Sequence, residues 1–179
     1  MRLIPRIKLL VITLLSIAFG CGDQPTPSLP LSFSFDLLNG SGSPATVFTQ
    51  GEPVTFRFQV INNSDLSVNV YNYYVDFCNQ NSSFFRVYSQ PETGGQFADY
   101  GRACFPQICT QIGAIGIAPK DTLTTQYNWL STEPECQARN APLPKGHYKT
   151  GFQQTFIGNG GAFDGATSKQ SFSIEFDIK

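Results

Sequence analysis

Cysteine is the residue whose number and placement say most about the chemistry of this chain. The 179 residues include five cysteines: Cys21, Cys78, Cys104, Cys109 and Cys136. In an exported protein cysteine thiols pair as disulfides, so an odd count leaves one thiol for another use. Assigning Cys21 to a covalent modification leaves an even set of four, which suits two disulfides in an oxidising compartment.

The residues before Cys21 have the pattern of an export signal. Arg2, Arg6 and Lys8 precede an uncharged, largely apolar run over residues 9–19. As a helix this run would span only about 16 Å, whereas the hydrocarbon core of a bilayer is about 30 Å thick. We therefore expect the run to be removed during export rather than to cross the membrane permanently.

The end of this signal resembles a lipobox, in which the cysteine sulfur takes a diacylglycerol. The four residues are Ala18, Phe19, Gly20 and Cys21, although Leu is usual in the place of Ala18 and a small residue in the place of Phe19. The alternative is an ordinary secretory signal cut near Gly20, with Cys21 left as a free thiol. We expect a signal peptide over 1–20, lipidated Cys21 with a flexible, proline-containing spacer over 21–30, and one domain over 31–179.

Candidate catalytic residues are few. His147 is the sole histidine, and its place between Gly146 and Tyr148 predicts a solvent-facing side chain rather than a base for a serine or cysteine nucleophile. Cys104 and Cys109 have a spacing that could suit zinc, but an exported chain favours a disulfide. The acidic pairs Glu133 with Glu135 and Glu175 with Asp177 are expected to face solvent. We therefore predict a protein that is not an enzyme, with no metal and no cofactor.

The charge balance argues against a nucleic-acid partner. Without the leader, 9 of the 12 basic residues remain against 13 acidic ones, a formal charge of about −4. A protein that holds a phosphate backbone usually carries a basic patch, and none is evident. Membrane attachment is expected through the lipid on Cys21 and not through charge.

The elements that must position these residues are predicted to be strands. Apolar and polar residues alternate with a period of two over residues 31–37, 54–60, 123–129 and 172–178. Turn residues separate these and several shorter segments, and a hairpin is expected around residues 90–95. About seven or eight strands in total predict an all-β, immunoglobulin-like antiparallel β-sandwich with Greek-key connections. The stretch from residue 100 to 120 is expected to be an irregular, disulfide-pinned loop.

The predicted strand order also suggests a disulfide pairing. The end of the third strand near Cys78 and the connection that carries Cys136 are expected at the same end of the sandwich. We therefore prefer Cys78 with Cys136 and Cys104 with Cys109 among the alternative connectivities.

One aromatic segment has two readings. Its rings could form a binding surface for a sugar or a protein, or they could fill the core of the sandwich, which we favour because two sheets must bury many aromatic side chains. The residues concerned are Tyr71, Tyr73, Tyr74, Phe84, Phe85 and Tyr88.

The segment 143–148 resembles the tyrosine corner of Greek-key sandwiches. In that motif a tyrosine at the start of a strand donates a hydrogen bond to the backbone a few residues upstream, and Tyr148 follows Gly146 at the expected spacing. The alternative is an ordinary strand tyrosine.

From residue 31 to 179 the order of features resembles the bacterial immunoglobulin-like domain named after intracellular proteinase inhibitors. The shared segments are 51–54 before a Phe-x-Phe strand, 60–64, a proline ahead of the Thr-rich strand that ends in Trp129, and 146–148. The resemblance implies the sandwich fold and suggests proteinase inhibition, but no inhibitory loop can be carried over residue by residue.

Together these features predict a non-enzymatic, lipid-anchored protein of the cell envelope, periplasmic or surface-exposed. Its β-sandwich would serve as an interaction module for an envelope protein or glycan. The alternatives are a proteinase inhibitor, a carbohydrate-binding module and an envelope hydrolase.

Overall fold

The computed structural model describes residues 28–71, 83–103, 114–130 and 141–179. This part of the chain consists of ten strands and one short 3-10 turn, η1 (Gly161–Phe163), in a two-sheet sandwich. The strands are β1 (Leu31–Leu38), β2 (Val47–Phe48), β3 (Thr55–Asn62), β4 (Val68–Tyr71), β5 (Arg86–Gln90), β6 (Ala98–Arg102), β7 (Ile115–Ile117), β8 (Thr122–Asn128), β9 (Gly146–Gly158) and β10 (Thr167–Ile178).

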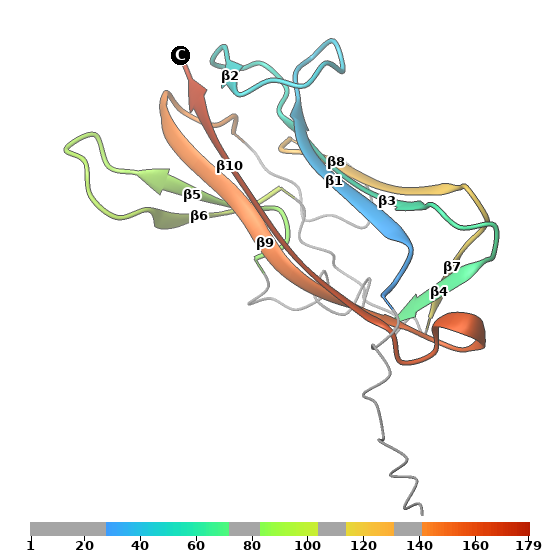
Figure 1. Ribbon diagram of the computed structural model, residues 1–179. Coiled ribbons are helices and arrows are strands. Elements are labelled where there is room, and N and C mark those ends of the chain that lie inside the picture. The colour runs from blue at the N-terminus through green and yellow to red at the C-terminus, as the bar shows by residue number, and fades with distance from the viewer. Residues whose placement is uncertain (1–27, 72–82, 104–113, 131–140) are drawn as a thin grey trace, which may run out of the picture.

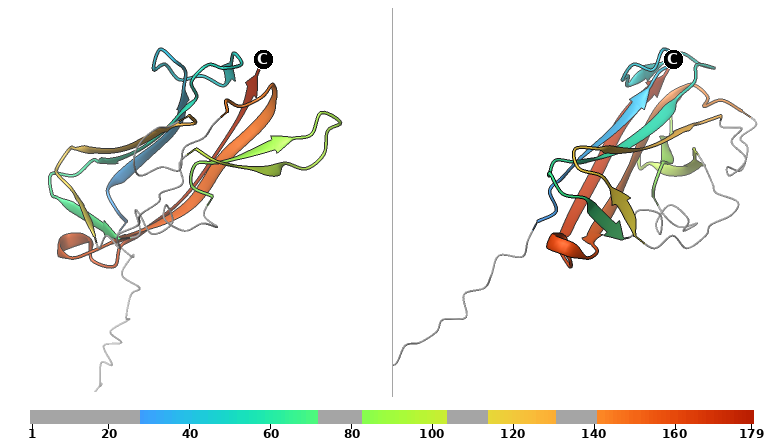
Figure 2. Two further views of the ribbon diagram at one scale, coloured as in Figure 1. Left: turned by 180° about the vertical axis from the view of Figure 1, so that it is seen from behind. Right: turned by 90° about the vertical axis from the view of Figure 1, so that its right-hand side faces the viewer.

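The smaller sheet has the order β1-β3-β8 and faces a larger sheet with the order β2-β10-β9-β4-β7 (Figure 1). Strand β9 is long enough for two neighbours along one edge: β5 pairs with its first residues and β4 with its last. The β5–β6 hairpin stands off the β9–β10 pair on the side away from the smaller sheet (Figure 2). All named pairs are antiparallel except β2 with β10.

The period-two alternation is the physical basis of these sheets. In β3, Phe56, Phe58 and Val60 are fully buried, while the residues between them are half-buried on the opposite face. Phe58 packs edge-on against Phe152, with ring centroids 5.2 Å apart, and so joins the two sheets. The all-β antiparallel sandwich predicted from the sequence is confirmed, while the Greek-key connectivity stays a prediction.

Two details differ from the sequence prediction. The number of strands is higher than seven or eight, because the two-residue β2 and the three-residue β7 are too short to show an alternation. The stretch expected to be irregular from residue 100 contributes the end of β6, which pairs with β5 through Arg102 and Arg86.

The packed domain begins earlier than residue 31. Ser28 forms a parallel bridge with Thr167, and Leu29 is buried in the core beside the turn that follows β9. The carbonyl oxygen of Pro30 accepts a hydrogen bond from the amide of Asn63 at 2.9 Å. Residues 28–30, which the sequence assigned to the spacer, therefore belong to the domain. The reason is the apolar side chain of Leu29, which is buried in the core.

Asn62 ties two connections together at the same end of the molecule. Its Nδ2 donates to the carbonyl oxygens of Leu66, Ile117 and Ala118 at 2.7, 3.1 and 2.9 Å. Its Oδ1 accepts from the amide and hydroxyl of Ser64 at 2.9 and 2.7 Å. The side chain is fully buried, so these bonds replace the water it would otherwise contact.

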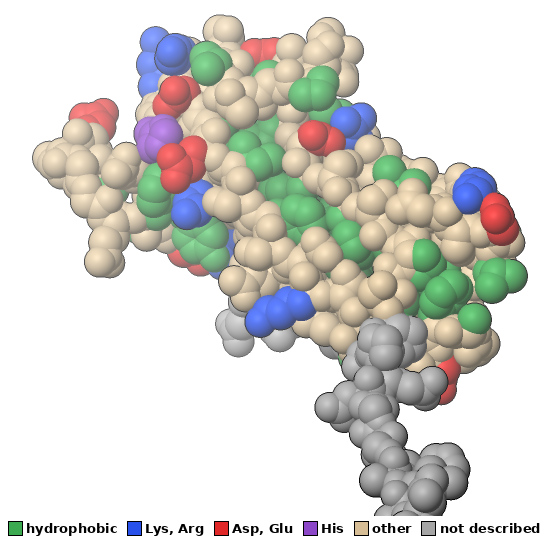
Figure 3. Space-filling view, viewed as in Figure 1, with side chains coloured by type: hydrophobic (Ala, Val, Ile, Leu, Met, Phe, Trp, Pro, Cys, Tyr) green, Lys and Arg blue, Asp and Glu red, His purple; other side chains and the backbone are tan. Residues whose placement is uncertain are grey.

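The sandwich has an opening between β1 and the part of β10 that precedes its short pairing with β2. Apolar side chains are visible along this seam in the space-filling view (Figure 3). A cavity of about 300 Å³ lies there, lined among others by Phe35, Leu37, Ala45 and Ile174.

Among the described residues, no helix has the length and apolar character needed to cross a membrane.

Candidate functional site

The structure separates the aromatic residues that the sequence grouped. Phe84 and Phe85 are 2% and 0% exposed and belong to the core, so they are not part of a binding surface. Tyr71 is exposed and pairs with Ile157 near the end of β9, whereas Tyr88 pairs with Lys149 near its start. Eight residues of strand separate those two positions by about 26 Å. Tyr73 and Tyr74 lie outside the described residues.

A tight turn before β5 explains the burial of the two phenylalanines. The amide of Arg86 donates to the carbonyl oxygen of Ser83 at 2.9 Å, and Phe85 adopts a φ of 53°. Both rings can then point into the sandwich instead of alternating between its faces. The carbonyl oxygen of Phe84 accepts from Nε of the buried Arg102 at 3.0 Å. Burial, with a smaller contribution from the positive charge of Arg86, lowers the pKa of Arg102 to about 10.

Tyr148 has the geometry of a tyrosine corner. Its hydroxyl donates to the carbonyl oxygen of Pro144 at 2.7 Å. Tyr148 also lies near the start of β9, which is where the motif places the tyrosine. The ring stacks on Phe176 at 5.4 Å between centroids. Burial, and to a smaller extent the neighbouring Tyr100, raises the pKa of Tyr148 to about 12.

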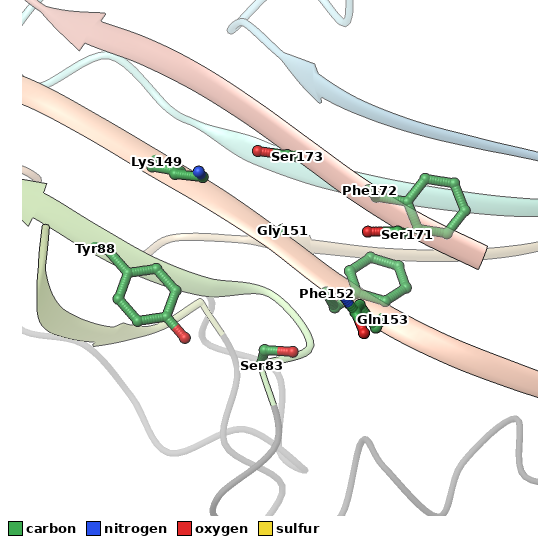
Figure 4. A pocket seen from close by; sticks show the side chains of 9 residues that line it. All are labelled: Ser83, Tyr88, Lys149, Gly151, Phe152, Gln153, Ser171, Phe172 and Ser173. Carbon is green, nitrogen blue, oxygen red and sulfur yellow. The ribbon is translucent and has the colours of Figure 1, made fainter. Parts of the chain in front are cut away.

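A groove of about 420 Å³ lies on the larger sheet, over the middle of β9 and β10. Side chains that point away from the core provide most of its lining, and the register of the hairpin sets them in rows: Gly151 lies opposite Ser173, and Gln153 opposite Ser171. Tyr88 and Ser83 lie on one side of β9, and the two serines of β10 lie on the other (Figure 4). The lining residues are Ser83, Tyr88, Lys149, Gly151, Phe152, Gln153, Ser171, Phe172 and Ser173.

Gly151 lies at a point where β9 and β10 leave no room for a side chain. A Cβ atom at this position would lie 2.2 Å from the carbonyl oxygen of Phe172 and 2.9 Å from Cα of Ser173. Both contacts are with backbone, which cannot rotate away as a side chain can. The missing side chain also leaves the floor of the groove bare between Lys149 and Gln153.

Lys149 is the charged residue of the groove. No carboxylate and no histidine belongs to the lining, and among the described residues the ammonium of Lys149 has no ion pair. It lies 5.9 Å from the centroid of the Phe97 ring, a distance at which a cation is weakly attracted. Its partner across the ladder, Glu175, contacts His147 at 3.6 Å instead. The groove therefore offers hydroxyl and amide groups, one phenol ring and one positive charge.

His147 joins the two acidic residues of β10 at the end of the same sheet face. Its Nδ1 lies 2.8 Å from Oδ1 of Asp177, and its Nε2 lies 3.6 Å from Oε2 of Glu175. All three residues were predicted to face solvent, and each is part-exposed. Their contact with one another was not predicted. The register of the β9–β10 hairpin brings them together, because residues 147 and 177 face each other in it.

The predicted cysteine chemistry cannot be placed. Cys21, Cys78, Cys104, Cys109 and Cys136, together with Glu133 and Glu135, lie outside the described residues. Within the described residues, no group of three or more histidine, cysteine or carboxylate side chains is arranged to hold a metal ion.

Comparison of the chain with protein-family models and with curated proteins finds no match. The solved structures that resemble it are remote. One, a target of the Northeast Structural Genomics Consortium, aligns over 83% of this chain and 88% of its own with 7% identity and a TM-score of 0.34. Another is a beta-glucosidase from Listeria innocua in complex with glucose, with 10% identity and a TM-score of 0.29; the alignment covers 82% of this chain and only 16% of the enzyme.

Similarities this remote carry no information about function. The resemblance to the immunoglobulin-like domains named after proteinase inhibitors stays a prediction from the sequence.

Proposed function

We propose that this protein is a lipid-anchored, non-enzymatic module of the cell envelope that binds a protein or glycan ligand in the groove on β5, β9 and β10. The observation that carries the proposal is the groove itself. Polar side chains and the aromatic rings of Tyr88, Phe152 and Phe172 line a hollow of about 420 Å³ on the paired strands of a sheet. That volume is within the range of ligand sites, and paired strands hold such side chains in nearly constant positions.

The groups in the groove support binding more than catalysis. Hydroxyls, an amide and an ammonium can orient a ligand, but acid–base catalysis of hydrolysis usually needs a carboxylate or a histidine beside the reacting bond. The pair formed by His147 and Asp177 lies outside the lining. No described serine or cysteine is bonded to that histidine as a nucleophile would be.

The anchor and the position of the groove support a role near a membrane. Since Ser28 is already paired with Thr167, a chain lipidated at Cys21 would have a tether of residues 22–27, which reaches at most about 20 Å. Ser171 and Ser173 lie four and six residues beyond Thr167 along β10, about 13 and 20 Å from the attachment point. A ligand in the groove would therefore be held close to the bilayer surface.

Two measurements on the full chain test this proposal. Intact-mass analysis of protein from membranes should show a chain that starts at Cys21 and carries a lipid increment, and Cys21→Ser should release the protein from the membrane fraction. A chain that starts at another residue, or that carries no lipid, would overturn the anchor.

A photo-crosslinker tests the groove. p-Benzoylphenylalanine in place of Ser171 should form an adduct with an envelope component in intact cells. The matched control carries the same group in place of Gln126, which is exposed on β8 in the opposite sheet. Equal labelling from both positions, or no adduct from position 171, would contradict a ligand site in the groove.

A further inference from the structure

We propose that the ligand of the groove is an acidic glycan, a chain of sugar rings that carries carboxylates such as those of uronic acids. This inference rests on the proposed function and names its ligand class. Three features of the lining support it: the ring of Tyr88, the row of hydroxyl and amide groups on β9 and β10, and the charge of Lys149.

The ring and the polar row match the two faces of a sugar. The C–H face of a pyranose packs on an aromatic ring, and its hydroxyls need donors and acceptors around the edge. Tyr88 is half-buried beside β9, and the exposed Gln153, Ser171 and Ser173 lie along the neighbouring rows. Serine hydroxyls and a glutamine amide each both donate and accept, as the hydroxyls of a sugar do.

An extended peptide fits this groove less well. A peptide that adds to a sheet needs unpaired backbone amides and carbonyls along a strand edge. The floor of the groove is instead formed by β9 and β10 in continuous register from Gly146 with Ile178 to Ile157 with Thr167. The backbone groups that β9 and β10 turn toward each other already bond across this ladder. The lining is supplied mainly by the polar side chains of Ser83, Lys149, Gln153, Ser171 and Ser173, beside the rings of Tyr88, Phe152 and Phe172.

Lys149 selects for an acidic sugar. Its ammonium has no carboxylate partner among the described residues, because Glu175, which faces it across the ladder, contacts His147. The lining contributes no negative charge that would repel a carboxylate. A carboxylate on the ligand would therefore supply charge-assisted hydrogen bonds that no described residue offers to Lys149.

The test is calorimetric titration of the full chain in detergent with two probes of equal length, a trimer of galacturonic acid and a trimer of galactose. We expect the acidic trimer to bind at least tenfold more tightly than the neutral one at low salt, and the difference to shrink as salt is added. Lys149→Gln should remove most of this preference. The matched control is Lys145→Gln, which removes the same charge from an exposed residue outside the lining and should leave it unchanged.

Variants of Tyr88 test the stacking. Tyr88→Phe keeps the ring and should retain most of the affinity, while Tyr88→Ala should weaken it at least tenfold; thermal melts establish that each variant is folded.

Equal affinity for the two trimers, or a preference that survives Lys149→Gln, overturns the assignment of an acidic sugar. If neither trimer binds while the crosslinker at position 171 labels an envelope protein, the glycan is wrong and the binding module stands. If the crosslinker also fails, the groove is not a ligand site.

Discussion

Gly151→Ala is expected to destabilise the protein through a backbone collision between its two longest strands. The new Cβ would lie 2.2 Å from the carbonyl oxygen of Phe172, whereas Cβ atoms essentially never come closer than 3.0 Å to another heavy atom. Strands β9 and β10 would have to part by about 0.8 Å in the middle of their ladder. Overpacking of this kind costs about 1–3 kcal/mol, and the lower entropy of an unfolded alanine chain offsets up to about 1 kcal/mol.

The net loss is therefore about 1–2 kcal/mol, which lowers the melting temperature of a domain of this size by roughly 2–8 °C. Thermal unfolding followed by circular dichroism measures it. The matched control is Gly40→Ala, since a Cβ there would make an ordinary contact of 3.6 Å with Cδ of Pro53. If both variants melt within 1–2 °C of the wild type, the close approach of the strands at Gly151 is wrong.

Three further changes probe other contacts. Tyr148→Phe removes the hydrogen bond to Pro144 and should cost about 1 kcal/mol in urea unfolding at neutral pH. Burial raises the folded pKa of Tyr148 to about 12, so the phenol ionises in the unfolded state before it does in the folded state. The free energy of unfolding of the wild type should therefore fall by roughly 2–3 kcal/mol between pH 10 and 12. The same alkaline loss in Tyr148→Phe would refute this explanation. Asn62→Asp turns a donor to three carbonyls into an acceptor and should cost at least about 3 kcal/mol, so an unchanged urea midpoint would be inconsistent with the buried bonds. Leu29→Ala should cost about 2–4 kcal/mol by the same measurement, whereas no loss is the outcome expected of a free tether.

The strands themselves were predictable wherever the period of two was long enough to recognise. Phe56, Phe58 and Val60 alternate with polar neighbours, and a strand with one face on a core needs no other signal. The hairpin around residues 90–95 was also recognised, and its two strands are β5 and β6. Tyr148 was recognised because a tyrosine corner is a local motif: its hydroxyl bonds to Pro144, only four residues upstream.

The groove could not be predicted, because cross-strand neighbours depend on register and not on local sequence. Tyr88, Gln153 and Ser173 have no common motif and are far apart in the chain, and they share a hollow only because β5, β9 and β10 pair as they do. Nothing in the local sequence around Gly151 indicates that the backbone of another strand approaches it. The same register turns a solvent-facing His147 into a bridge between two carboxylates.

The sequence by itself therefore determined the class of fold, most of its strands and the tyrosine corner, since these depend on hydrophobic alternation and on contacts a few residues apart. It also contains the pattern that predicts an export signal and the odd number of cysteines, on which the proposed anchor rests. Only the tertiary structure decided that Phe84, Phe85 and Leu29 are core, and that a groove lies on the outer face with Lys149, which has no ion pair within the described part of the chain. Each of these depends on which distant strands meet and in what register, because burial and charge pairing are properties of neighbours in space.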